Sequence, residues 1–579
     1  MNSSFLIIAG LIAFVFAYRF YARKIYKVLG IDNSKPTPAH TMSDGVDYCP
    51  ARMPVLLGHH FSSIAGAAPI IGPIVAAAYG WGPVFIWIVI GSIFLGGVHD
   101  LSSIIASIRH SGRSIGEVIE NHLGHKGKVL FLIFCLATLI LVIAVFMAVV
   151  AKTFVATPST ATSSFLYILL AIIFSLCINK LGFSFKWTTI VFIPLLFLSV
   201  WLGVQFPFVI PASGLLIPGI GITLSPNNFW ICILLAYIFI ASVTPVWILL
   251  QPRDFLSSFL LYALIGAGVF GIIFVHPTIQ TPAFTEFNVG KIGMLFPMLF
   301  VTVACGAISG FHSIVASGTT AKQLNQENDA VPVGYGAMLI EGLLAIIALI
   351  TAVKLSKPEY LQMLKAKGPI DVFAHGIGSC LSALHIPHKL GHTFATLAVS
   401  AFALTTLDTG TRLCRFCLQE LFTFKKKVSN NEKPKTSIDR YSATLICVIL
   451  GGALALSGEW KTMWPVFGSA NQLLAAIALL AISMWLYHTG RNIWYTVIPM
   501  IFMFTVTLSA LVVSFLRNFD TAKTVWSQIQ TQSTEALKYS FMTKCVLSGT
   551  TLLLFILGTG LLILAINTVL KQKQLKLKK

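Results

Sequence analysis

The chain has 579 residues, of which 56% are hydrophobic and only 10% are charged. Soluble globular proteins carry roughly 25% charged residues, so this composition excludes a soluble chain and predicts an integral membrane protein. The net charge of +20 lies in short basic clusters between apolar runs, without the interleaved aromatic residues that single-stranded nucleic acid requires. The composition therefore excludes nucleic acid as a partner and leaves the lipid bilayer.

A transmembrane helix needs about 20 mainly apolar residues. The sequence contains fifteen such runs, near residues 3–20, 60–80, 83–108, 129–152, 164–182, 187–206, 229–250, 256–276, 292–318, 334–354, 392–414, 441–457, 464–487, 494–516 and 541–568. The predicted fold class is an all-α integral membrane protein with about 15 transmembrane helices.

Basic residues mark alternate connections between these runs. Clusters of Lys and Arg follow the first, third and eleventh spans, whereas residues 207–228 contain no charge at all. Because cytoplasmic loops carry the excess of Lys and Arg, we expect a periplasmic N-terminus and a cytoplasmic C-terminus. An odd number of spans agrees with this orientation.

The second span contains helix-breaking residues near its centre. Glycine and proline cluster in the segment Gly66, Ala67, Ala68, Pro69 and Gly72, which Pro73 follows. Non-helical backbone at membrane depth is tolerated only inside protein or beside a water-filled cavity, and its free amides and carbonyls can hold a solute. The alternative is a simple proline kink with close packing of small residues.

The seventh span repeats this pattern. Thr244 and Pro245 interrupt its second half, and Trp247 follows them. By the predicted topology, the second and seventh spans run in opposite directions and lie five spans apart. Paired interrupted helices of this kind indicate an inverted-repeat transporter with a solute site near the middle of the membrane. We therefore expect both segments to bind the solute.

Ionisable and hydroxyl side chains inside spans are the candidates for ion or proton coupling. They are Asp100, Ser309, His312, Ser313 and Asp408. Such groups are costly in a bilayer and usually functional, and histidine titrates near neutral pH. Two alternatives stay open, because Asp408 precedes Arg412 by one helical turn and can pair with it, and because hydroxyls also join helices structurally.

A metal site is the less favoured interpretation of the remaining polar residues. His59, His60, His99 and Asp100 have suitable zinc-ligand side chains, but no HExxH or paired Cys/His spacing is present. The sequence thus predicts no cofactor. A membrane-embedded metalloenzyme and a nutrient sensor remain as alternative functional classes.

Five segments resemble the carbon starvation protein family. They are GHHFSSIAGAAPIIGP (58–73), GVHDLSSIIASIRHSGRSIGE (97–117), CGAISGFHSIVASGTTAKQL (305–324), ALTTLDTGTRLCRFCLQE (403–420) and FGSANQLLAA (467–476). The resemblance implies a bacterial inner-membrane transporter of the amino acid-polyamine-cation superfamily with a leucine-transporter-like core. Such a core consists of two inverted five-helix repeats.

The resemblance also implies a division of the chain. Residues 1–58 would hold the first helix and a cytoplasmic loop, 59–228 the first repeat, 229–440 the second repeat, and 441–579 a four-helix extension with a basic tail. The ninth span would lie against the second. The expected function is proton-coupled import of peptides during carbon starvation, with pyruvate as the alternative solute and no enzymatic activity. The oligomeric state stays open.

Overall fold

The computed structural model describes residues 2–44, 48–216, 223–245, 248–290, 292–422, 438–457, 460–532 and 534–577. Within these residues, twelve helices are long and apolar enough to cross a membrane, and one bent helix pair makes a thirteenth span. Two further predicted spans correspond to the shorter helix Arg440–Leu456 and to a second interrupted helix. The prediction of an all-α polytopic membrane protein is confirmed.

The first half of the chain forms helices and one small hairpin. Their bounds are α1 Ser4–Phe16, η1 Ala17–Tyr21, α2 Ala22–Leu29, α3 Pro38–Thr41, α4 Met53–Ile64, α5 Ala68–Ala76, η2 Ala77–Tyr79, α6 Trp81–Ile90, η3 Gly91–Gly96, α7 Gly97–Arg109, α8 Ile115–Ala156, α9 Pro158–Asn179, α10 Phe185–Gln205, β1 Leu215–Leu216, β2 Thr223–Leu224, α11 Pro226–Val243 and α12 Leu250–Val275.

The second half begins with another small antiparallel hairpin. Its elements are β3 Asn288–Val289, β4 Gly293–Met294, α13 Leu295–Thr302, α14 Gly310–Gly318, η4 Thr320–Lys322, η5 Glu327–Asp329, η6 Val331–Gly336, α15 Ala337–Val353, α16 Lys357–Ala366, α17 Pro369–Ser382, α18 His388–Leu421, α19 Arg440–Leu456, α20 Trp460–His488, α21 Trp494–Thr531 and α22 Glu535–Leu577.

The predicted interruption of the second span is present. α4 ends at Ile64, Ala65–Ala67 are not helical, and α5 begins at Ala68, so that the two halves meet at an angle of 48°. Pro69 lies in the first turn of α5, where its missing N–H costs no helical hydrogen bond. The break therefore lies at Ala65–Ala67, before Pro69, and Pro69 itself is part of the second helix.

The prediction of a break within the seventh span is wrong. α11 is continuous, and Thr244 is its C-terminal cap. Proline disfavours a helical conformation in the residue before it, so Thr244–Pro245 ends the helix instead of bending it. Pro245 is exposed in the connection to α12, and Trp247 lies outside the described residues.

The second interrupted helix is formed by α13 and α14. Residues Val303–Ser309 separate the two halves. The interrupted pairs α4–α5 and α13–α14 run antiparallel. The backbone N–H of Ala51, before α4, donates to the Gln323 carbonyl after α14 (2.9 Å), and the Tyr79 hydroxyl, after α5, donates to the Gly293 carbonyl before α13 (2.9 Å).

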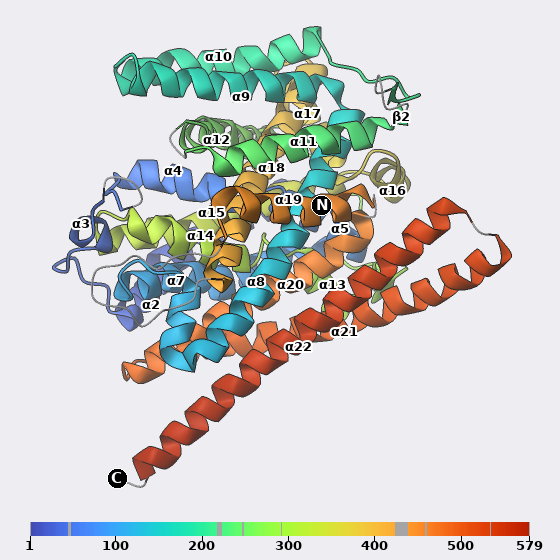
Figure 1. The fold of residues 1–579 in the computed structure, drawn as a ribbon. Coiled ribbons are helices and arrows are strands. Elements are labelled where there is room, and N and C mark those ends of the chain that lie inside the picture. Colours follow the sequence, from blue (N-terminus) through green and yellow to red (C-terminus); the bar gives the residue numbers. More distant parts are fainter. Residues whose placement is uncertain are drawn as a thin grey trace.

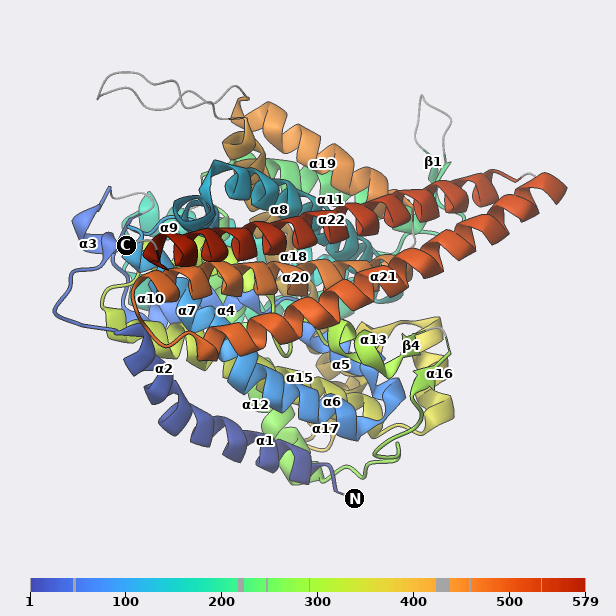
Figure 2. The same ribbon diagram turned by 90° about the horizontal axis from the view of Figure 1, so that it is seen from below.

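The helix contacts show a reciprocal arrangement around these two pairs. α5 packs on α15 while α14 packs on α7, and α12 packs on α4 while α20 packs on α14. The long helices α8 and α18 lie against each other, and α11 and α19 also meet. The hairpin α9–α10 lies at one edge of the molecule, and α21 and α22 form a long pair that projects beyond the helical body (Figures 1 and 2).

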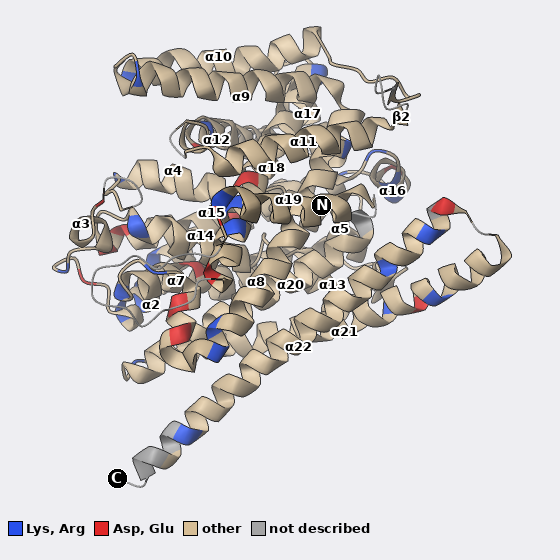
Figure 3. Ribbon diagram, in the orientation of Figure 1, with Lys and Arg blue, Asp and Glu red and all other residues tan. Residues whose placement is uncertain are grey.

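Charged residues are sparse along this helical body (Figure 3). Most lie in loops and at helix ends, but acidic positions also occur inside the body, beside α18 and between α7 and α14. Buried charges are costly unless they are paired. The interior acidic positions therefore locate the candidate functional site.

Candidate functional site

One buried polar cluster joins α7, α14 and α15. The Asp100 carboxylate lies 2.7 Å from Nδ1 of His99 and 2.8 Å from Nδ1 of His312. Nε2 of His312 in turn lies 3.4 Å from Oε2 of Glu341. All four side chains have no solvent exposure. The structure therefore brings the predicted residues Asp100 and His312 together and adds Glu341.

The break between α13 and α14 contributes a cysteine to this cluster. Sγ of Cys305, a potential ligand nitrogen of His312 and a carboxylate oxygen of Glu341 all lie within 4.8 Å of one another. Asn471, on α20, donates from Nδ2 to the Cys305 sulfur (3.4 Å) and accepts from the backbone N–H of Phe311 (2.9 Å). Asn471 therefore caps the N-terminus of α14 and also donates a hydrogen bond to the Cys305 thiol.

A second buried cluster joins α11, α12 and α18. The Arg253 guanidinium donates to the Asp408 carboxylate and lies 3.1 Å from Oδ1 of Asp254. Tyr237 donates to Asp408 (2.8 Å), and Nδ1 of His59 lies 3.7 Å from Oδ2 of Asp254. The two carboxylates thus share one buried arginine.

Asp408 has a different ion-pair partner from the one that helical spacing indicated. Its carboxylate pairs with Arg253 on α12. Arg412 instead donates to the carbonyl oxygens of Ala241 (2.8 Å) and Thr244 (2.9 Å) at the end of α11. A cation at this position satisfies carbonyls that the helix leaves unpaired.

The two interrupted helices touch where the second turn of α5 meets the end of α13. A Cβ on Gly72 would lie 2.5 Å from the Thr302 carbonyl oxygen and 3.1 Å from Cα of Val303, so only glycine allows this approach. A Cβ on Gly306 would lie 2.8 Å from Cβ of Ala345 and 3.8 Å from Cα of Pro69, and Gly66 lies against Thr406 of α18. The expected contact between the second and ninth spans is confirmed.

The N-terminus of α5 is buried at this contact. Ala68 begins the helix, and the preceding N-cap residue, Ala67, has a side chain that makes no capping hydrogen bond. By contrast, Asn471 caps α14. Thr244 and Pro245, predicted to bind the solute together with the second span, lie at the end of α11.

The remaining predicted polar residues each have a partner within hydrogen-bond distance. Ser309 bonds Asn471, Ser313 donates to the Gly310 carbonyl (2.7 Å), and Nδ1 of His60 lies 2.7 Å from the Thr320 hydroxyl. The four predicted metal ligands therefore do not form one group. His59 lies beside Asp254, His60 beside Thr320, and His99 and Asp100 beside each other. Among the described residues, the group with metal-ligand geometry is Cys305, His312 and Glu341.

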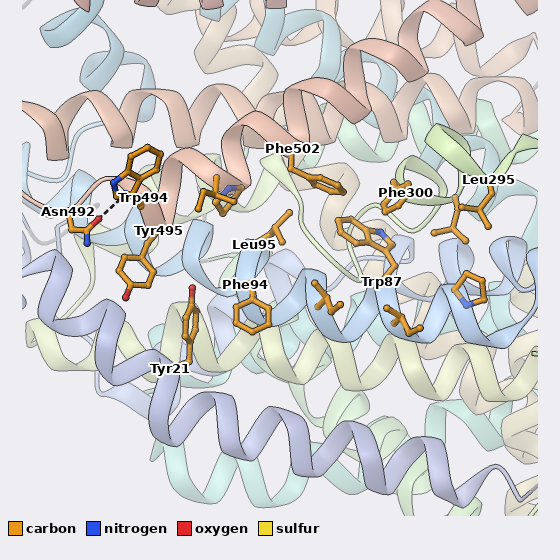
Figure 4. A pocket seen from close by; sticks show the side chains of 16 residues that line it. Tyr21, Trp87, Phe94, Leu95, Leu295, Phe300, Asn492, Trp494, Tyr495 and Phe502 are labelled. Carbon is orange, nitrogen blue, oxygen red and sulfur yellow. Dashed lines mark hydrogen bonds between the residues drawn. The ribbon is translucent and has the colours of Figure 1, made fainter.

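A separate groove of about 830 Å³ lies along α6, η3, α13 and α21 (Figure 4). Its walls are apolar and include Trp87, Phe94, Phe300 and Phe502. Several lining side chains, such as Phe94 at 43%, are exposed on the outer surface. None of the predicted site residues lines this groove, whose composition suits lipid chains rather than a polar solute.

Five residues of the two clusters were not predicted from the sequence, namely Glu341, Arg253, Asp254, Cys305 and Tyr237. Glu341 is the single acidic residue in an apolar run, and this feature of the sequence indicates a functional position. Arg253 and Asp254 lie between two predicted spans and were expected in a loop. Cys305 was one of several cysteines in apolar segments, and nothing in its spacing distinguished it.

The fold and the two buried clusters define a polytopic membrane protein with paired, antiparallel interrupted helices. The sequence matches the family described as carbon starvation protein CstA over residues 2–367 and 359–510. The chain belongs to this family. The peptide transporter CstA of Campylobacter jejuni is 33% identical over 576 residues, which cover 88% of this chain and 80% of that protein.

Two further relatives come from Escherichia coli. The peptide transporter CstA is 32% identical, covering 88% of this chain and 81% of that protein. The pyruvate/proton symporter BtsT is 31% identical with the same coverage. Among solved structures, the manganese transporter of Eremococcus coleocola is 11% identical, with 91% of this chain and 99% of that chain covered and a TM-score of 0.47. MhsT in complex with L-phenylalanine is 13% identical, with coverages of 88% and 99% and a TM-score of 0.47.

Proposed function

We propose that the protein is a secondary active transporter that imports a small carboxylate-bearing nutrient, most simply a peptide. The observation that carries this proposal is the contact between the two antiparallel interrupted helices at Gly72 and Thr302. Non-helical backbone at membrane depth, paired in this way, is the arrangement in which transporters hold a solute near the membrane midplane.

The uncapped N-terminus of α5 supports a carboxylate as the recognised group. Amide groups at a helix N-terminus carry a partial positive charge and favour anions. Ala67 and Ala68 present small side chains there, and Gly66 and Gly72 allow other chain segments to approach. In this proposal the solute lies between the break at Ala65–Ala67 and the break at Val303–Ser309.

Asp408 is the proposed proton-coupling group. Its carboxylate is held by Arg253 and Tyr237, while Asp254, with His59 beside it, faces the same arginine. Protonation of Asp408 removes the negative charge that holds Arg253 and thereby loosens α12 from α18. A buried ion pair between two helices can in this way respond to the transported proton.

Pyruvate is the second candidate solute, because the relative BtsT is named a pyruvate/proton symporter. Both solutes carry a carboxylate, so the same helix N-terminus suits either.

The proposal places the protein in a bacterial inner membrane with a periplasmic N-terminus. It also revises the expected division, with a first repeat of α4–α5, α6–α7, α8, α11 and α12 and a second of α13–α14, α15, α18, α19 and α20.

Uptake by purified protein in liposomes tests this function. Labelled pyruvate and labelled dipeptides are offered with and without an imposed pH gradient. Accumulation of dipeptide against its concentration gradient supports the peptide proposal, and pyruvate accumulation without competition by dipeptides replaces it with the second candidate. Absence of gradient-driven accumulation of either solute contradicts proton-coupled import.

A further inference from the structure

The buried group Cys305, His312 and Glu341 is unusual in its chemistry. It offers one sulfur, one nitrogen and one carboxylate oxygen within 4.8 Å of one another. Cys305 is 6% exposed and the other two side chains are fully buried. Cysteine, histidine and glutamate are together the residue types that bind zinc and related divalent transition metals.

Two members of this group have polar atoms with no hydrogen-bond partner in the described part of the chain. They are Nε2 of His312 and both carboxylate oxygens of Glu341. Buried polar atoms are normally hydrogen-bonded, because an unpaired buried group costs about 1–3 kcal/mol, and more when it is charged. Nε2 and Oε2 lie 3.4 Å apart and face each other. A shared cation satisfies both.

The surrounding residues support ligation. Asp100 lies 2.8 Å from Nδ1 of His312, so it can accept the Nδ1 proton and leave the Nε2 lone pair free. Metal-binding histidines are oriented by carboxylates in this way. Nδ2 of Asn471 donates to the Cys305 sulfur, which stabilises its thiolate form. Two of the three donors thus have an oriented supporting partner.

We propose that Cys305, His312 and Glu341 bind one divalent transition-metal ion of the zinc type. A thiolate, a carboxylate and a neutral imidazole carry two negative charges, which one divalent cation balances. Ligand atoms of a tetrahedral zinc site lie about 3.5 Å apart. The three ligand atoms here lie within 4.8 Å of one another, so they need to approach by about 1.3 Å at most. Three protein ligands leave a fourth position open to water.

The site would join the break of the α13–α14 helix to α15. Cys305 lies in the non-helical segment, His312 in α14 and Glu341 in α15. The bound ion therefore fixes the conformation of the second break. This inference does not depend on which solute is transported, nor on Asp408.

Metal analysis and cobalt substitution test the site. Purified wild-type protein is dialysed against zinc, and its metal content is measured. Apoprotein is then titrated with Co²⁺, whose thiolate complexes show charge-transfer absorption in the near ultraviolet. We expect one equivalent of zinc per chain and the charge-transfer band. We expect Cys305→Ser to lose the band and Glu341→Gln, which removes a direct ligand, to weaken Co²⁺ binding by more than the about 10- to 100-fold that loss of a supporting partner costs.

Cys380→Ser is the matched control, because Cys380 is a buried free cysteine on α17 outside the group. It should retain both the stoichiometry and the band. Gel filtration and thermal unfolding of each variant establish that loss of binding is not loss of fold. Failure of folded wild-type protein to bind zinc or Co²⁺ overturns the proposal, as does a charge-transfer band that persists in Cys305→Ser. If the wild-type protein binds neither metal, His312 and Glu341 share a proton rather than a metal ion.

Discussion

Arg253 on α12 and Asp408 on α18 form an ion pair whose side chains are 0% and 1% exposed. The two residues lie 155 positions apart in the sequence. Asp254 and Tyr237 complete their surroundings. This pair joins α12 and α18, and both helices pack against α4, the first half of the interrupted helix α4–α5.

Replacing Asp408 by asparagine should uncouple uptake from the proton gradient. The amide keeps the shape of the side chain but cannot bind and release a proton. We expect gradient-driven accumulation in liposomes to be lost while exchange of labelled for unlabelled solute continues. Asp520→Asn, an exposed position on α21, is the control. Undiminished accumulation by Asp408→Asn would assign this residue a structural role.

Replacing Arg253 by methionine should destabilise the fold. The change leaves Asp408 and Asp254 buried without their shared cation. Breaking a buried pair on one side costs about 3–5 kcal/mol. We expect a clear decrease in the thermal unfolding midpoint in detergent. Lys365→Met, which removes an exposed charge, should leave the midpoint unchanged. Equal midpoints for the two variants would show that the arginine adds no stability.

Fusion reporters test the proposed orientation. A fluorescent protein at the C-terminus should fluoresce, because the C-terminus is expected in the cytoplasm. Alkaline phosphatase fused after Pro211, within the uncharged segment 207–228, should be active, since the enzyme folds only outside the cytoplasm. The reverse pattern would contradict the assignment from basic loops.

The sequence predicted the first interrupted helix and missed the second for a physical reason. Proline and glycine together at Gly66–Pro73 indicate a break strongly, whereas Val303–Ser309 contains only Gly306 and no proline. The Thr244–Pro245 signal was real but marks a helix end. Proline restricts the residue before it in either situation, so sequence alone does not distinguish an interrupted span from a terminated one.

Individual polar residues were predicted better than their partners. Asp100, His312 and Asp408 are conspicuous because ionisable residues are rare in apolar spans. Their contacts with Glu341 and Arg253 join helices that are distant in sequence, and local spacing carries no information about them. The helix spacing that indicated an Asp408–Arg412 pair describes neighbours within one helix only.

The two interrupted helices approach each other closely where α5 meets the end of α13, and glycine substitution tests this contact directly. Gly72→Ala places a methyl group 2.5 Å from the Thr302 carbonyl, whereas a methyl group at Gly266 of α12 meets nothing within 4 Å. Forcing the backbones apart costs about 1–3 kcal/mol. Where this cost adds to the barrier for transport, the rate falls by about 5- to 160-fold.

The decisive measurement is the initial rate of gradient-driven solute uptake by wild-type protein, Gly72→Ala, Gly266→Ala and Pro245→Ala, each reconstituted at equal amounts of folded protein. The account predicts that Gly72→Ala loses uptake while Gly266→Ala and Pro245→Ala retain wild-type rates. Full uptake by Gly72→Ala together with loss in Pro245→Ala would contradict it, and would return the solute site to the end of α11.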